Sequence, residues 1–405
     1  MGQAKRSLEE IEARGFNSYD TIVCIECISE PAVRAFIDQN GVSAKCSYCE
    51  EISEHTIEFD LLLELILKSL SYEWNSPNDE CLPWNSREGG YYGTEVFDTW
   101  DLLLDVIGFD VEKDSLISDV VNAICNEQWC EKKHYSLSKD KVLLYGWKAF
   151  SDFVKNTARF VFYKARNPKY DADQHDEMNP VDILESIGQM VKELGLVKII
   201  KKDTEFKRIR TTKTDENFST AEDLGSPPAD KAVFANRMSP SGIPMFYGAF
   251  DVKTALKETY ETSEDEVKAF CATFKAVRDL VVIDLSSEFE IPSLFDAERR
   301  DKRGAIKFLI DFVEDFSKPI QRSDGAHVEY VPTQIVTEYF RHLLTVNNQR
   351  IDAVIYPSSK EKSGKAIVIF ANSAQCIEPN EAIQNALLVL HNVETFDPKL
   401  KLEKP

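Results

Sequence analysis

The stretch MFYGAFDVKTALKETY, residues 245–260, predicts a buried strand followed directly by a helix. Residues 245–250 form an apolar run after the turn-rich residues 239–244, which is the pattern of a short strand inside a core. Asp251 is expected to cap the helix, because a carboxylate at this position accepts hydrogen bonds from the first backbone N–H groups. A helix over residues 254–260 would place Glu258 about two turns from its start.

Arginines on both sides of this stretch predict an anion site. The run FKRIR, residues 206–210, has the composition of a strand, and side chains two apart on a strand share a face, so Arg208 and Arg210 would point the same way. Arg237 lies in the run NRM, residues 236–238. A guanidinium presents a planar fork of donors that matches paired phosphate oxygens. We interpret the three arginines as a clamp for the pyrophosphate of a dinucleotide.

Glu258 supplies the kind of group that cleavage of a dinucleotide at its nicotinamide bond requires. The transition state of that cleavage resembles an oxocarbenium ion, so a fixed carboxylate near the ribose, or a hydrogen bond to the ribose hydroxyls, stabilises it. The sequence alone does not identify whether water, phosphate or a macromolecule accepts the ribosyl group.

Each candidate residue also has a structural interpretation that the sequence leaves open. Arg210 could be a solvated surface residue, and Tyr247, inside an apolar run, could be core packing. Glu258 could be an exposed helix carboxylate. Ser358, in the run YPSS at residues 356–359, could serve a turn. The joint order and spacing of these residues favour the functional interpretation.

The C-terminal half resembles the RES domain family, which is named for arginine, glutamate and serine. The similarity lies in the Arg-x-Arg run at residues 208–210, AEDLGSPPADKAVFANRMSPSGIPMFYGAFDVKTALKET at 221–259, VVIDLSS at 281–287, VEYVPTQIVTEYFR at 328–341 and IDAVIYPSSKEKSGKAIVIF at 351–370. It implies a compact α+β fold similar to ADP-ribosyltransferases. It also implies an NAD-degrading activity that is toxic in bacteria.

The resemblance also implies roles for individual residues. Arg208 and Arg237 would hold the phosphates of NAD and take part in catalysis, Tyr247 would stack near the nicotinamide, and Glu258 would be the catalytic carboxylate. Ser358 corresponds to the family serine and is expected to be a polar contact to NAD. Arg210 joins this set through its place on the same strand as Arg208.

The overall composition is that of a soluble globular protein with several domains. The chain has 405 residues, 43% hydrophobic and 29% charged, with a formal net charge of -21, and its length suffices for sizeable cores. An acidic surface repels nucleic-acid backbones, so binding to nucleic acid is disfavoured. The basic residues within 198–210 are interpreted as serving a small anion, although solvated lysines at a domain junction are an equal alternative for residues 198, 201 and 202.

A cytoplasmic location is expected. No apolar run approaches the roughly 20 residues of a membrane span, and the polar residues 1–19 lack the core of a signal peptide. Nine cysteines, an odd number, argue for a reducing compartment and against a disulfide framework.

Four of the cysteines form two CxxC pairs and predict a structural zinc site. Cys24 and Cys27 form the first pair, and Cys46 and Cys49 form the second, with residues 28–45 as the spacer between them. Each pair can place two thiolates on one tetrahedral metal ion, and a site closed by four thiolates leaves no open position for catalysis. Buried cysteines or a redox CxxC are the alternatives. Cys125 and Cys130, with a nearby histidine, are interpreted as buried hydrophobic residues.

Helical periodicity follows the cysteine pairs. Residues 59–71, 96–107, 116–129 and 141–164 carry apolar residues at helical spacing, which favours a helical bundle. This arrangement is similar to the HEPN-like domains that precede RES domains. HEPN ribonucleases carry an arginine and a histidine four to six residues apart on a helix. The helical half lacks such a pair, and the single match, at residues 322–327, lies in a turn-rich part of the other half, so RNase activity is disfavoured.

The predicted organisation is multidomain. It comprises a segment with a four-cysteine zinc ribbon at 1–52, an α-helical HEPN-like domain at 53–170, a linker with a connecting helix at 171–203, an α+β RES domain at 204–395 and a tail at 396–405.

The leading functional hypothesis is an NAD+ glycohydrolase or phosphorylase. The alternatives are an ADP-ribosyltransferase and a non-catalytic protein that senses a nucleotide. An RNA-binding zinc ribbon is the least favoured alternative. Because loss of NAD is lethal, we expect the N-terminal half to restrain the site or to dock a trigger protein or antitoxin. Phage infection is one candidate trigger, and homo-oligomerisation is left open.

Overall fold

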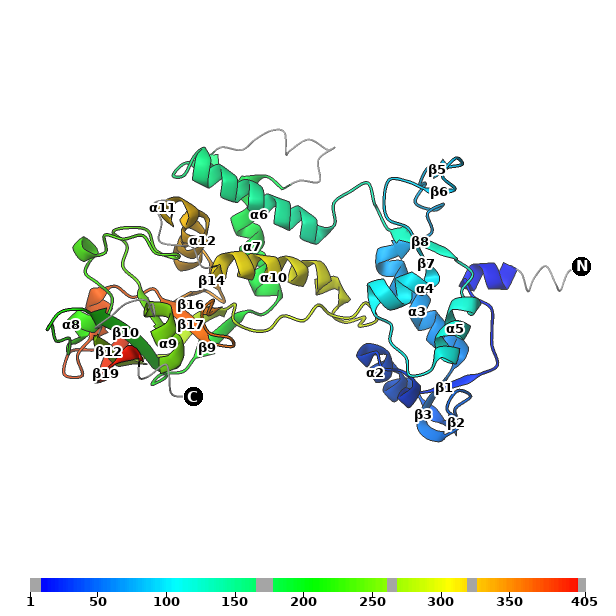
Figure 1. Ribbon diagram of the computed structural model, residues 1–405, viewed down its shortest axis with the longest axis horizontal. Helices are drawn as coiled ribbons and strands as arrows, with labels where there is room; N and C mark the ends of the chain where they lie inside the picture. Colours follow the sequence, from blue (N-terminus) through cyan, green and yellow to red (C-terminus); the bar gives the residue numbers. More distant parts are fainter. Residues whose placement is uncertain (1–8, 165–177, 261–267, 319–325, 400–405) are drawn as a thin grey trace, which may run out of the picture. The chain divides into compact units, whose positions relative to one another are not determined.

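The computed structural model describes residues 9–164, 178–260, 268–318 and 326–399, and these fall into two compact units (Figure 1). Unit 1 comprises Met1–Ser138 and Glu290–Gly304, and unit 2 comprises Lys139–Phe289 and Ala305–Pro405. This division differs from the predicted boundaries, because the expected ribbon and helical domains share unit 1 and the boundary falls after Ser138. Residues 171–177 of the predicted linker, 400–405 of the predicted tail and 322–325 of the arginine–histidine match lie outside the described residues.

Unit 1 begins with the zinc-ribbon region. Its three-stranded sheet has the order β1-β3-β2, with β1 at Ile22–Cys24, β2 at Val42–Lys45 and β3 at Ile52–Glu58. The short helix η1 (Ile25–Cys27) and helix α2 (Pro31–Asn40) lie between β1 and β2. Glu30 caps α2 by accepting a hydrogen bond of 2.6 Å from the backbone N–H of Val33, which satisfies one of the free donors at the start of the helix.

Helices and short strands complete unit 1 around one apolar core. The helices are α3 (Phe59–Glu73), α4 (Thr99–Asp101), the π-helical η2 (Leu102–Ile107) and α5 (Asp114–Ala123). The strands are β4 (Trp74–Asn75), β5 (Trp84–Asn85), β6 (Gly90–Tyr91), β7 (Phe97–Asp98) and β8 (Gln128–Glu131). The core is built from large apolar side chains that are almost fully buried, among them Phe16, Phe59, Leu62, Leu63, Ile66 and Phe109.

The predicted helical bundle is only partly correct. The helix expected over residues 59–71 is α3, but the one expected over residues 116–129 ends at Ala123. Residues 128–131 instead form β8, which pairs with β4 on one side and with β7 on the other. The indole of Trp129 donates a hydrogen bond of 2.9 Å to Thr99. Partners remote in sequence therefore override the local helical pattern.

A remote segment completes the core of unit 1. Leu294 and Phe295 are 1% and 3% exposed and belong to this core, and the ring of Phe295 lies 5.5 Å from that of Phe109. Arg303 donates to the carboxylate of Glu73 at 2.7 Å. Residues 290–304 are thus a structural part of unit 1, although the whole of residues 139–289, which belong to unit 2, precedes them in the chain.

Unit 2 is organised around a nine-stranded sheet of order β18-β19-β12-β10-β11-β17-β16-β13-β9. Neighbouring strands are antiparallel except for two parallel pairs, β13 with β16 and β18 with β19. The strands are β9 (Val197–Ile200), β10 (Glu205–Thr212), β11 (Phe246–Ala249), β12 (Lys268–Ala276), β13 (Leu280–Asp284), β16 (Ala353–Pro357), β17 (Lys365–Ile369), β18 (Cys376–Ile377) and β19 (Leu388–Phe396). A two-stranded sheet of β14 (Thr345–Val346) and β15 (Gln349–Arg350) accompanies it.

Helices pack against the sheet of unit 2. The main ones are α6 (Lys139–Asn156), α7 (Ile183–Glu193), α9 (Val252–Thr259), α10 (Arg303–Ser317) and α12 (Val331–His342). Shorter helices of the same unit are α8 (Ala221–Leu224), α11 (Ala326–Glu329), η3 (Phe162–Lys164), η5 (Pro180–Asp182), η6 (Ala229–Lys231) and η8 (Ser373–Gln375), whereas η7 (Arg300–Lys302) belongs to unit 1. Helices α6, α7, α10 and α12 share a core with Val354 and Val368 of the sheet. The other face carries a second core that includes Phe206, Phe246 and Phe274.

Helix α6 lies within the predicted N-terminal helical domain at 53–170, but in the structure it belongs to unit 2. Trp147 and Phe150 of α6 are buried in the core of unit 2. The indole N–H of Trp147 donates a hydrogen bond of 3.1 Å to Asp315 on α10. The sequence periodicity identified the helix but contained no signal for the partner against which its apolar face packs.

Helix α10 permits a test of this packing. Phe312 is fully buried and contacts Trp147 and Phe308, with ring centroids 5.1 and 5.9 Å away. Replacing Phe312 with alanine is expected to destabilise unit 2 by about 3–5 kcal/mol, because it leaves a large cavity. Ile310→Ala is the control, since Ile310 on the same helix is 36% exposed. The measurement is the free energy of unfolding in urea, followed by circular dichroism. An equal decrease in both variants would contradict this packing of Phe312.

Among the described residues, no helix combines the length and the apolar character that crossing a membrane would need.

Candidate functional site

The strands β10 and β11 separate next to the predicted arginines. Their ladder consists of one residue pair, Lys207 with Ala249, although both strands continue beyond it. Where they diverge, the side chain of Arg208 donates a hydrogen bond of 2.7 Å to the carbonyl oxygen of Tyr247 and lies 5.4 Å above the ring of Phe246. The guanidinium thus satisfies a carbonyl that a continuous sheet would pair with a backbone N–H.

Arg208 is a half-buried cation without a carboxylate partner in the described parts of the chain. Burial lowers the pKa of its guanidinium, because removing a charge from water favours the neutral form. The bond to the Tyr247 carbonyl uses only one of the five N–H donors of the side chain. Arg208 is therefore suited to bind an anion at the point where the sheet opens.

Arg210 is placed differently from Arg208. It is exposed, donates a hydrogen bond of 2.6 Å to the carbonyl of Asp223 in α8, and lies 3.8 Å above the ring of Phe218. The two arginines share a strand face, as the period of two predicts. Arg210 contacts α8 and the residues that precede it rather than the other candidate site residues.

Arg237 lies in a loop held by helix α12. The hydroxyl of Thr333 donates to the carbonyl of Arg237 at 2.5 Å, and the amide of Gln334 donates to the carbonyl of Asn236 at 2.8 Å. The Nε atom of Arg237 is buried and has no hydrogen-bond partner among the residues that the structure describes. Since a buried donor without an acceptor is costly, this guanidinium has capacity for a ligand.

Tyr247 points into the same region from β11. Its hydroxyl lies 2.9 Å from that of Ser239. Burial raises the pKa of Tyr247 to about 12, because the phenolate would lose its hydration. Tyr247 therefore keeps its proton at neutral pH.

Glu258 and Ser358 are in direct contact, although they are far apart in the chain. The hydroxyl of Ser358 donates a hydrogen bond of 2.5 Å to a carboxylate oxygen of Glu258. Asp251 caps α9 as predicted, accepting from the backbone N–H of Thr254 at 2.7 Å, and this cap fixes the start of the helix that carries Glu258. The carboxylate is half-buried at the end of β16.

The turn after β16 orients the serine hydroxyl. The backbone N–H groups of Lys360 and Glu361 both donate to the Ser358 oxygen, at 3.2 and 3.1 Å. These two donors occupy the lone pairs of the hydroxyl, so its proton is directed toward Glu258. Ser358 thus serves the turn, as one interpretation of the sequence proposed, and also contacts Glu258.

Tyr356 belongs to this group and was not among the predicted site residues. It lies on β16 and is 6% exposed. Burial raises its pKa, and the nearby charge of Glu258 adds to the effect, while Arg237 opposes it. Its place two residues before Ser358 on a strand was the available signal, because residues two apart share a face.

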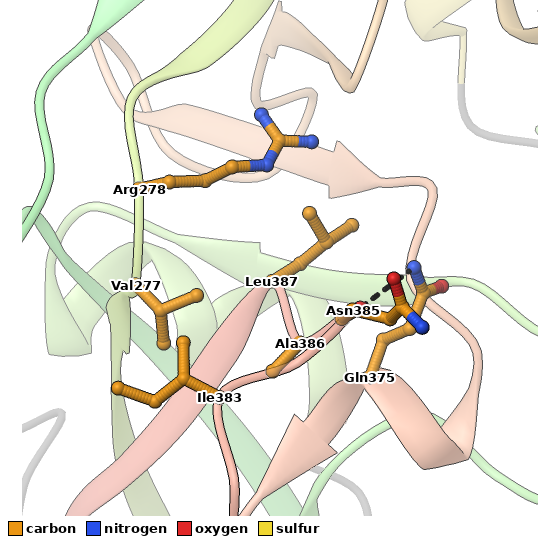
Figure 2. Close-up of a pocket in the computed structure, with 7 residues that line it drawn as sticks. All are labelled: Val277, Arg278, Gln375, Ile383, Asn385, Ala386 and Leu387. Carbon is orange, nitrogen blue, oxygen red and sulfur yellow. Dashed lines mark hydrogen bonds between the residues drawn. The ribbon is translucent and has the colours of Figure 1, made fainter.

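The structure therefore brings Tyr247, Glu258, Ser358 and Arg237 together, with Tyr356 added and Arg208 at the separation of the strands. The pocket shown in Figure 2 lies elsewhere, beside the turn between β12 and β13, and has a volume of about 510 Å³. Val277, Ile383 and Leu387 form its apolar part, and Arg278, Gln375 and Asn385 extend around it. None of the predicted site residues lines this pocket.

The four predicted metal ligands converge in unit 1. The sulfur of Cys24 lies 3.6 Å from those of Cys27 and Cys49, and the sulfurs of Cys27 and Cys46 are 3.7 Å apart. A tetrahedral zinc ion with Zn–S bonds of about 2.3 Å requires sulfur separations of about 3.8 Å. The geometry therefore fits a structural zinc ion held by all four thiolates.

In the absence of a metal charge the local environment shifts the pKa values of these thiols in opposite directions. Burial raises the pKa of Cys24 to about 11. At Cys46 burial acts in the same direction, but hydrogen bonds from the backbone of Cys49 and Tyr48 outweigh it and lower the pKa to about 7. Within the described ranges no other group of histidine, cysteine or acidic residues is arranged to hold a metal. Cys130 is buried as predicted, but the prediction that Cys125 is buried is wrong, because Cys125 is exposed.

The fold and the two sites define a class of protein in which a unit with a four-cysteine cluster is joined to a mixed helix-and-sheet unit with an arginine–glutamate–serine site. The family model of the RES domain matches residues 205–389, and that of HEPN/RES N-terminal domain 1 matches residues 39–168. The chain therefore contains HEPN/RES N-terminal domain 1 followed by a RES domain. No curated protein and no solved structure matches the chain. The presence of a RES domain is consistent with chemistry on NAD.

Proposed function

We propose that the protein is an NAD+ glycohydrolase or phosphorylase that cleaves the bond between nicotinamide and ribose. The observation that carries the proposal is the carboxylate of Glu258, held by Ser358 in the group that contains Tyr247, Tyr356 and Arg237. A single oriented carboxylate beside cationic groups matches a substrate that bears a pyrophosphate and passes through a cationic ribosyl centre.

Each residue has a defined role in the proposed reaction. Arg208 and Arg237 bind the pyrophosphate, with Arg210 contributing at the outer end, and Tyr247 packs near the nicotinamide. Glu258 stabilises the positive charge that develops on the ribose as the C–N bond breaks and neutral nicotinamide leaves with the bonding electrons. Water or inorganic phosphate then attacks the anomeric carbon through an oxygen atom. With water the attacking oxygen loses a proton to solvent, and with phosphate the product is a ribosyl phosphate.

The proposal extends to fold ancestry and to regulation. We propose that unit 2 is related to ADP-ribosyltransferases, in which case a macromolecule could replace water as the acceptor. We further propose that depletion of NAD is toxic and serves bacterial defence, in the cytoplasm, under the control of an antitoxin or trigger protein that acts through the N-terminal region. Assembly into a homo-oligomer would be a further route to control.

The test is to incubate the full-length protein with NAD, with and without inorganic phosphate, and to follow free nicotinamide by chromatography. Release that depends on phosphate would identify a phosphorylase, and release without phosphate a glycohydrolase. NAD labelled on the adenine would reveal transfer to a macromolecule. Intact NAD under all conditions, with NAD binding shown by calorimetry, would favour the nucleotide-sensing alternative instead.

A further inference from the structure

We propose that the hydroxyl of Tyr356 is a specificity-determining contact that donates a hydrogen bond to one ribose hydroxyl of the bound ligand. The adjacent ribose hydroxyl would donate a hydrogen bond to the carboxylate of Glu258. This inference rests on the proposed function, because it specifies which part of NAD occupies the space beside Glu258. The group that the site recognises would then be the vicinal diol of the ribose, with Tyr356 and Glu258 each contacting one hydroxyl.

The sheet register places Tyr356 on the same face as Tyr247. Tyr247 on β11 is paired with Val368 on β17, and Val368 is paired with Val354 on β16. Residues directly opposite each other across a sheet share a face, and so do residues two apart on one strand. Tyr356 therefore projects from the same face as Tyr247, and Ser358, two residues further on, meets Glu258.

The hydroxyl of Tyr356 lacks a partner among the residues that the structure describes. The side chain is 6% exposed, and no described residue forms a hydrogen bond with its hydroxyl. A phenylalanine would fill nearly the same space, so the hydroxyl, which can donate and accept a hydrogen bond, is what the tyrosine adds at this position. The hydroxyl thus gains an acceptor when a ligand enters.

A second unpartnered group supports the same conclusion. Within the described ranges the Nε atom of Arg237 is buried without an acceptor, and Arg237 and Glu258 both lie near enough to Tyr356 to influence its ionisation. A carboxylate that accepts and a phenol that donates fit two adjacent hydroxyl groups, because each hydroxyl is both a donor and an acceptor. The Arg237 donor is left for the adjoining phosphate.

The experiment compares two probes, ADP-ribose and ADP, bound to the full-length protein in isothermal titration calorimetry. ADP lacks the second ribose, so it does not reach Tyr356. The Tyr356→Phe variant is expected to bind ADP-ribose about tenfold more weakly than the wild type, as expected for loss of one hydrogen bond, and to bind ADP equally well. Tyr339→Phe is the matched control, since Tyr339 is a half-buried tyrosine on α12, and its affinities should stay at the wild-type values.

The outcomes separate this inference from the proposed reaction. Equal binding of ADP-ribose by Tyr356→Phe and wild type would overturn the inference even if NAD is cleaved. An equal loss of affinity for both probes would also overturn it, because the effect would then not involve the second ribose. A selective loss for ADP-ribose would support it even if the wild type releases no nicotinamide.

Discussion

Glu258→Gln is expected to lower the rate of nicotinamide release by roughly 10²–10³-fold, the range seen when one preorganised electrostatic contact to a transition state is removed. Glutamine has nearly the same shape and its amide oxygen can still accept the hydrogen bond from Ser358, which is 2.5 Å in the wild type. The change therefore removes the negative charge while keeping the local geometry. Because the charge acts mainly on the transition state, the loss should fall on kcat more than on KM.

The control for this variant is Glu314→Gln. Glu314 is an exposed residue of α10 in the same unit, so its replacement changes the net charge equally without touching the site. Nicotinamide release should stay at the wild-type rate. A Glu258→Gln variant that retained activity within a few-fold of wild type would show that another group stabilises the ribosyl centre.

Replacing Cys27 with serine, or removing zinc with a chelator, is expected to unfold unit 1. Cys27 is 1% exposed and lies between Cys24 and Cys46 in the four-cysteine cluster. Structural zinc contributes an apparent free energy of about 10–16 kcal/mol to the folding of small zinc domains. Without the metal, unit 1 would lose this contribution. Four of the five tryptophans, at positions 74, 84, 100 and 129, lie in unit 1, so tryptophan fluorescence reports mainly on this unit.

The measurement pairs bound zinc with this fluorescence. Wild-type protein should carry one zinc per chain, and Cys27→Ser should carry less than one and show red-shifted emission. Cys81→Ser is the matched control, because Cys81 is exposed and lies outside the cluster. Unchanged emission and thermal stability after complete removal of zinc would mean that the four cysteines do not support unit 1 through a metal.

Local signals predicted the parts of the site that neighbouring residues determine. The Asp251 cap, the buried run before it and the spacing of the two CxxC pairs each act over a short stretch of chain, and the structure shows the cap, strand β11 and the converged sulfurs. The contact between Glu258 and Ser358 joins distant segments. The sequence analysis assigned both residues to one site through family resemblance but did not predict their contact, because periodicity carries no information about which segments meet.

The errors arose where tertiary partners decided the outcome. The helix predicted over residues 116–129 ends at Ala123, and residues 128–131 instead form a strand that pairs with two short strands. Residues 290–304 have no feature that distinguishes them from a loop, yet Leu294 and Phe295 complete a core whose other members lie before Lys139. Tyr356 was missed because a tyrosine in an apolar strand is ordinarily core packing, and only its hydroxyl, unpartnered among the described residues, separates the two cases.

The return of residues 290–304 into unit 1 determines what a single backbone cut can release. A protease that nicks the chain after Ser138 would yield fragments 1–138 and 139–405, and the second fragment would still supply Leu294, Phe295 and Arg303 to the fold of the first. The two pieces should therefore copurify. For the same reason, deleting residues 1–170 would strip those apolar side chains of their cover and also remove α6 from unit 2. A clean excision must remove 1–138 and 290–304 together and retain α6.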